Sequence, residues 1–198
     1  MPAFSLTRRT SLLLPFLLAA CGGSDDDRTS FAPLRYDYLP TIPLNVATLQ
    51  MEMRFVPARL ASDVTESDPI DLLETMKTLA SDRLKPVGAK DRAVFAIRQA
   101  SLIQRGDQIT GTLEATLEII TDDGQHAGYA QARARRQHTG RIDNLRGKLY
   151  DMTVGMMDDM NVELEFQIRK NLKDWISDTV TAAPTPVSAD PLPAPLRR

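Results

Sequence analysis

The chain has 198 residues but only one cysteine and two histidines. A single cysteine has no disulfide partner within the chain and cannot build a cysteine-rich zinc site. The two histidines, His126 and His138, lie near the two ends of one predicted strand, too far apart to share a metal ion. We therefore expect no metal site and no cofactor.

The sequence also lacks the short motifs that mark common active sites. It contains no G-x-S-x-G, no P-loop and no G-x-G-x-x-G. Acidic residues such as Asp158 and Asp159 fall in a predicted helix, where solvated or salt-bridged roles are commoner than catalysis. Because no nucleophile and base come together, a hydrolase is disfavoured. We expect a protein that is not an enzyme and has no catalytic residues.

Excess positive charge and long apolar runs are absent as well. Residues 1–20 contain two arginines and no acidic residue, so residues 21–198 carry 22 basic and 26 acidic residues and a formal charge of −4. This charge argues against a nucleic-acid partner, which would need a basic face, and against tight electrostatic docking on anionic lipid. No apolar run approaches the roughly 20 residues that a transmembrane helix needs.

The first 20 residues are typical of a secretory signal peptide. Arg8 and Arg9 give a positive start, and the apolar stretch SLLLPFLLAA follows over residues 11–20. This stretch is interrupted by Pro15 and is too short to span a bilayer as a helix. We therefore expect residues 1–20 to be removed during export.

The stretch Leu18-Ala19-Ala20-Cys21 resembles the lipobox of bacterial lipoproteins, which reads Leu-Ala/Ser-Gly/Ala-Cys. The resemblance implies cleavage before Cys21, diacylglycerol on its sulfur and a fatty acid such as palmitate on its new amino group. Several acyl chains hold a protein stably on a membrane, at about 0.8 kcal/mol per buried CH₂. Gly22 follows the cysteine where inner-membrane lipoproteins tend to have Asp, which implies the periplasmic face of the outer membrane. The alternative is an incidental thiol in an ordinary signal peptide.

Two segments that flank the folded part are predicted to be flexible. Residues 21–43 form a lipidated linker, with flexible glycines, the solvated run Asp25-Asp26-Asp27 and several prolines. Tyr36, Tyr38 and Leu39 are expected to begin packing on the domain. Residues 179–198 are a proline-rich, disordered tail of polyproline character, with a ligand for another protein as the alternative.

Alternating apolar and polar residues predict a strand over residues 44–56, with Met51 and Met53 on its apolar face. Asp68 followed by Pro69 predicts a capped helix over 69–84. A second strand is expected over 92–104, with a bulge near Arg98-Gln99 that reconciles its two faces. Gly106-Asp107 then forms a tight turn into the next strand.

Residues 108–121 have the clearest strand pattern, and Asp123-Gly124 predicts a two-residue hairpin turn. The resulting register predicts these inner pairs: Leu113 with Ala134, Ala115 with Ala132, and Leu117 with Ala130. It predicts these outer pairs: Glu114 with Arg133, and Thr112 with Arg135. Every pair falls on a face that suits it, and the row of three alanines leaves room for a close helix.

Apolar residues at helical spacing predict a long helix over residues 144–176. Gly147 and Gly155 weaken its first half and suggest a kink or a late start. Its methionines either pack in the core or, with nearby arginines, form an adaptable partner surface. This candidate surface comprises Arg133, Arg135, Arg136, Met156 and Met157. The arginines could meet a phosphate-bearing lipid or an acidic partner, or else be balanced by Glu114 and Glu118.

The element order predicts an α+β domain over residues 44–178, a four-stranded, mainly antiparallel sheet with two helices packed on one face. This order, β-α-β-β-β-α, resembles small outer-membrane lipoproteins that assist lipopolysaccharide assembly or ABC-type phospholipid transport. The resemblance implies a non-catalytic accessory lipoprotein that binds envelope proteins, anchored to the membrane through Cys21. The alternatives are a lipid- or glycan-binding carrier or sensor and, less favoured, an envelope hydrolase. The oligomeric state is left open.

Overall fold

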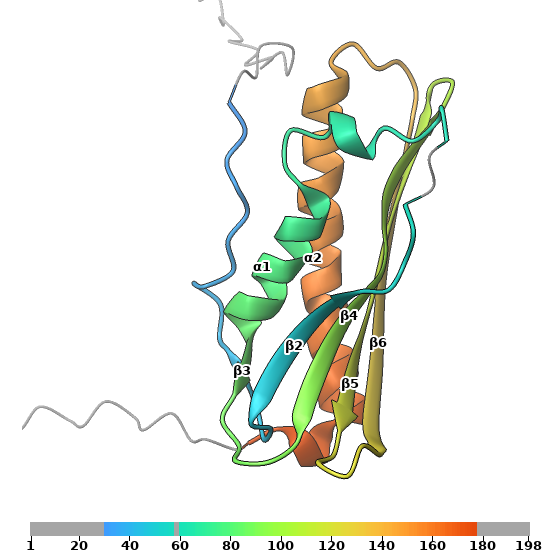
Figure 1. The fold of residues 1–198 in the computed structure, drawn as a ribbon. Coiled ribbons are helices and arrows are strands. Elements are labelled where there is room, and N and C mark those ends of the chain that lie inside the picture. Colours follow the sequence, from blue (N-terminus) through green and yellow to red (C-terminus); the bar gives the residue numbers. More distant parts are fainter. Residues whose placement is uncertain (1–29, 58–59, 178–198) are drawn as a thin grey trace, which may run out of the picture.

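The computed structural model describes residues 30–57 and 60–177. The predicted α+β fold is confirmed: a four-stranded sheet in the order β2-β4-β5-β6 carries two helices, α1 and α2, on one face (Figure 1). The sheet is mostly antiparallel, and only β2 runs parallel to its neighbour β4. Its strands are β2 Thr48–Met53, β4 Arg92–Arg105, β5 Gln108–Ile120 and β6 His126–Thr139.

The prediction of one strand over residues 44–56 is wrong, because the chain turns at Asn45. The N–H of Val46 donates to the carbonyl of Leu44 over 2.8 Å, which closes a three-residue turn. Before this turn, β1 (Ile42–Leu44) pairs in parallel with β3 (Leu84–Pro86) in a separate small sheet, and after it comes β2. The folded region also begins before residue 44, since Tyr36 is buried and Leu39 packs against the core, whereas the prediction is wrong for Tyr38, which is exposed.

Helix α1 spans Leu72–Arg83 and is capped by Asp71, so the prediction that Asp68 caps it is wrong. The Asp71 carboxylate accepts hydrogen bonds from the backbone N–H groups of Leu73 and Glu74. Asp68 instead follows a short 3-10 helix at Thr65–Ser67. Its carboxylate accepts from the hydroxyl of the buried Thr153 on α2 over 2.5 Å, so it ties the segment that precedes α1 to α2.

The predicted bulge in β4 is confirmed by a register shift between Ile97 and Gln99. All five predicted pairs between β5 and β6 are confirmed as well. The hairpin turn itself differs, because Thr121 pairs with Gln125 through a backbone hydrogen bond and so closes a three-residue loop. Ala127 is then an extra residue in β6, between the pairs Ile120–His126 and Ile119–Gly128, and it restores the predicted register.

Helix α2 spans Leu145–Asn171 and runs through both glycines, so the suggested late start is wrong. Asn144 caps it by accepting from the N–H of Gly147. At Gly155 a Cβ atom would lie only 2.2 Å from a guanidinium nitrogen of Arg136, so glycine lets this arginine lie against the helix. The helix ends earlier than predicted, and a 3-10 turn at Lys173–Trp175 follows it.

The core lies between the sheet and the two helices. Ala130, Ala132 and Ala134 are buried on the inner face of β6, where α2 lies close. Met156 and Met157 have no exposed surface, which confirms the core alternative. The prediction that these two methionines belong to an exposed partner surface is therefore wrong.

Candidate functional site

The three arginines of the predicted partner surface point in two directions. Arg133 and Arg135 lie on the outer face of β6, where they pair with Glu114 and Thr112 of β5. Arg136 lies on the helix side and makes two hydrogen bonds to Asp159 of α2, over 2.7 and 2.9 Å. The five residues predicted as one surface are thus divided among two faces and the core.

The two outer arginines differ in how free they are. Arg133 donates to the Glu114 carboxylate, with its Nε atom at 2.9 Å, so its charge is balanced as the alternative interpretation expected. Arg135 is exposed and makes no ion pair with any described residue. It is therefore the one member of the predicted set whose charge is free to meet a partner.

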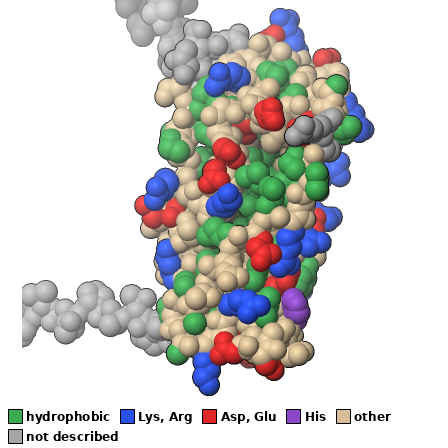
Figure 2. Space-filling view, viewed as in Figure 1, with side chains coloured by type: hydrophobic (Ala, Val, Ile, Leu, Met, Phe, Trp, Pro, Cys, Tyr) green, Lys and Arg blue, Asp and Glu red, His purple; other side chains and the backbone are tan. Residues whose placement is uncertain are grey.

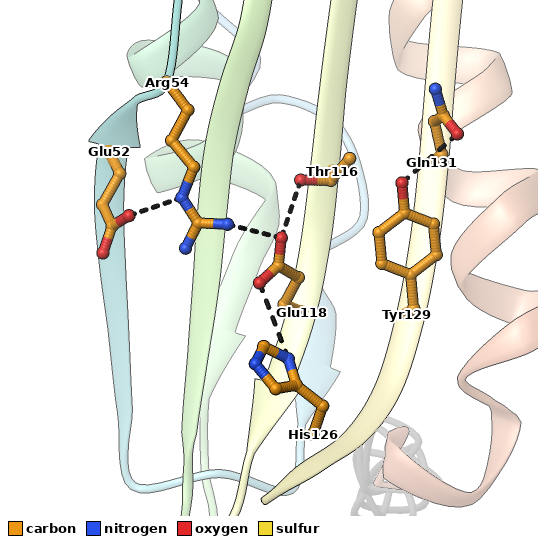
Figure 3. Close-up of polar contacts among 7 residues, drawn as sticks. All are labelled: Glu52, Arg54, Thr116, Glu118, His126, Tyr129 and Gln131. Atoms are coloured by element: carbon orange, nitrogen blue, oxygen red, sulfur yellow. Dashed lines mark hydrogen bonds and ion pairs between the residues drawn. The ribbon is translucent and has the colours of Figure 1, made fainter. Parts of the chain in front are cut away.

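The outer face of the sheet also carries a polar network centred on Glu118 (Figure 3). Its carboxylate accepts from Nη1 of Arg54 over 2.6 Å and from the hydroxyl of Thr116 over 3.3 Å. His126 Nδ1 lies 3.8 Å away. Arg54 donates through Nε to Glu52 over 2.7 Å, so the network ties the end of β2 to β5 across β4.

The electrostatics of this network favour the charged forms. Burial raises the pKa of the Glu118 carboxyl, but the hydrogen bonds from Arg54 and Thr116 and the charge of Arg54 outweigh burial. The pKa of Glu118 therefore lies below its ordinary value. Hydrogen bonds to Glu118 and Glu52 raise the pKa of Arg54. A carboxylate held ionised in this way is a poor general acid. The ion pair between Arg54 and Glu118 instead braces the end of β2 against β5.

Sequence patterns could not identify the partner of Glu118. Glu118 was expected to balance arginines of β6, but Arg54 lies 64 residues earlier in the chain. It reaches Glu118 only because β2 pairs in parallel with β4, which the pattern of β2 does not reveal. The alternation of residues along β5 placed Glu118 correctly on the outer face of the sheet, and the sequence held no other indication of this network.

An exposed apolar surface follows the edge strand β2. Met51 and Met53 point to the inner face as predicted, opposite Phe95 and Ile97, yet they are 36% and 54% exposed. Because they lie at the edge of the sheet, the prediction that they belong to a half-buried face is wrong. Val56 and Leu60 extend the exposed set beyond the strand. Figure 2 shows hydrophobic side chains gathered near the centre of this view of the molecule.

A second surface feature is an open groove of about 520 Å³ between the edge of β6 and α2. Three of its residues carry amide side chains and two are charged, so it offers hydrogen-bond donors and acceptors. Its lining comprises Tyr129, Gln131, Arg133, Glu163, Gln167 and Asn171. Strand β6 forms the border of the sheet here, because no described strand pairs with its outer edge. The groove suits a polar ligand or an extended chain.

Within residues 30–57 and 60–177, no group of three or more His, Cys, Asp and Glu side chains could hold a metal ion. His126 and His138 stand at opposite ends of β6, as predicted. No helix in the same part of the chain is long and apolar enough to cross a membrane. Cys21 and the proline-rich tail, 179–198, lie outside the described residues.

No protein-family model matches the chain, and no curated protein sequence matches it. Among solved structures, the chain is similar to a minor lipoprotein from Acinetobacter baumannii, with 14% identity and a TM-score of 0.36 over 66% of this chain and 98% of that one. It is similar to a protein from Caulobacter crescentus described as a "putative lipoprotein", at 10% identity and a TM-score of 0.28, over 61% and 83% of the two chains. A third is lipoprotein GNA1162 from Neisseria meningitidis, at 8% identity and a TM-score of 0.26, over 60% and 97%.

Proposed function

We propose that this protein is a lipid-anchored accessory lipoprotein of the bacterial envelope, which binds a transport or assembly protein and catalyses no reaction. The observation that carries the proposal is the lipobox Leu18-Ala19-Ala20-Cys21, which follows an apolar stretch too short to span a bilayer. Gly22 after the cysteine supports the periplasmic face of the outer membrane. The acyl chains on Cys21 supply the attachment to the membrane.

The free edge of β6 supports binding of a protein segment. An edge strand presents unpaired N–H and C=O groups, and an extended segment can add to them as a further strand. The groove beside α2 would receive the side chains of that segment. Because Arg135 is exposed and unpaired among the described residues, the segment that fits this edge carries acidic residues.

The groove also supports a second candidate function, the binding of a glycan. Gln131, Gln167 and Asn171 line it, and amide side chains can both donate to and accept from sugar hydroxyls. Tyr129 adds an exposed ring at the same place. A glycan would be held by these amides, whereas an acidic protein segment depends on the arginine charge.

The test is affinity purification of the full-length protein from solubilised membranes, followed by quantitative mass spectrometry. We expect one envelope transport or assembly protein to be recovered in stoichiometric amount, and Arg135→Glu to reduce that recovery. The matched control is Arg98→Glu, since Arg98 is also an exposed sheet arginine without an ion pair to a described residue. Equal recovery with both variants would contradict the proposed surface, and co-purification of a glycan alone would favour the second candidate.

A further inference from the structure

Strand β2 has an open hydrogen-bonding edge. The N–H of Arg54 donates to the carbonyl of Ile97 on β4 over 2.8 Å. Since backbone groups alternate in direction along a strand, those of Met51 and Met53 point away from β4. No described strand pairs with that side of β2. Such an edge is a template for a further strand.

The side chains of this edge show what would cover it. On the inner face, Met51 and Met53 are exposed and the half-buried Phe55 follows them. On the outer face, Glu52 and Arg54 place opposite charges two residues apart (Figure 3). A segment that fits must be apolar on the inner face and carry an acidic and a basic residue on the outer face. The same segment of a second copy meets both requirements.

We infer that β2 is a contact between two copies of this chain, paired antiparallel about a twofold axis at Met53. In this register Met53 faces Met53 of the second copy, and Met51 faces Phe55. On the outer face, each Glu52 faces Arg54 of the other copy, so two ion pairs form. The two sheets become one continuous sheet through an isologous contact, in which each copy contributes the same residues.

The charges select this register over its neighbours. Antiparallel pairing must match the outward-pointing backbone groups of Met51 and Met53 with those of the second copy, and this register also requires the segment after β2 to extend the strand through Phe55. An axis at Glu52 would set two carboxylates directly opposite, which destabilises the pair. An axis at Met51 would place Glu52 opposite Gln50 and leave no ion pair between the copies.

Arg54 retains the capacity for this contact. Its Nε and Nη1 atoms bind Glu52 and Glu118, whereas Nη2 donates to no described residue. The side chains of Glu52 and Arg54 are 42% and 30% exposed. The brace to Glu118 therefore positions a guanidinium that still presents donors to the second copy.

Disulfide trapping tests the contact and its register. In full-length protein carrying Cys21→Ser, a substituted cysteine is the only thiol, so the outcome does not depend on lipidation. A hydrogen-bonded antiparallel pair has Cα atoms about 5.5 Å apart, within disulfide range. Met53→Cys should therefore form a cross-linked dimer. Met51→Cys should not, since its two copies would lie about 14 Å apart along the strands.

The oligomeric state gives a second readout. Light scattering on the detergent-solubilised protein should give a protein mass of twice that of the single chain left after cleavage before Cys21. Met53→Lys should halve this mass and leave the single chain folded, as circular dichroism would show, because the Met53 side chain is half exposed. Val162→Lys, at an exposed site on α2, should leave the mass unchanged. A protein of single-chain mass at every concentration, or equal cross-linking at both cysteine positions, would overturn the inference.

Discussion

Glu118 lies on the open face of the sheet, yet its side chain is almost fully buried among its partners. The alternation of β5 predicted the face on which Glu118 lies. Its partner Arg54 was not predictable, because the pairing of β2 with β4 joins distant parts of the chain. Asp68 and Asp71 show the same limit. The Pro69 that follows Asp68 favoured it as the helix cap, but Asp71 caps α1, and Asp68 accepts a hydrogen bond from Thr153 of α2 instead.

At the scale of single residues, Asp71→Ala should reduce the free energy of unfolding by about 0.5–2 kcal/mol, because α1 loses its cap. Asp71→Asn should retain most of the stability, since an asparagine side chain also caps. Urea unfolding of the two variants and the wild type measures the difference. An unchanged midpoint for Asp71→Ala would show that the helix is not held by this cap.

Glu118→Gln should reduce stability at pH 7 by about 1–3 kcal/mol, because Arg54 loses its charged acceptor. Since the pKa of Glu118 is lowered in the folded state, the carboxylate stabilises the fold above the ordinary glutamate pKa of about 4.3. This contribution is lost as the pH falls through the lower pKa of the folded state. The stability difference between wild type and variant should therefore disappear in acid. A difference that stays constant from pH 7 to strong acid would contradict the brace.

At the scale of elements, the hairpin of β5 and β6 was predictable because its alternation is local and every cross-strand pair fits. The extra residue Ala127 shows that the register depends on the pairs more than on the turn, since the bulge compensates for a longer loop. The division between β1 and β2 was not predictable. It depends on β3 and β4, strands that lie some 40 residues further along the chain.

Ala132→Glu should destabilise the domain by several kcal/mol, because it places an unpaired carboxylate between the sheet and α2. The matched control is Gln137→Glu on the exposed face of the same strand, with an expected change within about 0.5 kcal/mol. Denaturant melts compare the two. If the control were the more damaging, β6 would face the other way and the alanine row could not lie under α2.

At the scale of the whole molecule, one face of the sheet is covered by helices and the other carries the Glu118 brace. The two outer edges of the sheet, β2 and β6, differ in character: one is apolar with paired charges, and the other is polar with a groove. We assign self-association to the first and partner binding to the second. Neither edge was predictable as a site, because strand order depends on long-range pairing.

The central claim is that the protein is anchored through Cys21, and metabolic labelling with an alkyne-bearing palmitate tests it most directly. Cells producing the wild-type chain or Cys21→Ser are grown with the label, and the purified proteins are compared. The account predicts label on the wild type, which sediments with membranes. It predicts no label on Cys21→Ser, which accumulates as uncleaved precursor or as soluble periplasmic protein. Undiminished label on Cys21→Ser would contradict the account.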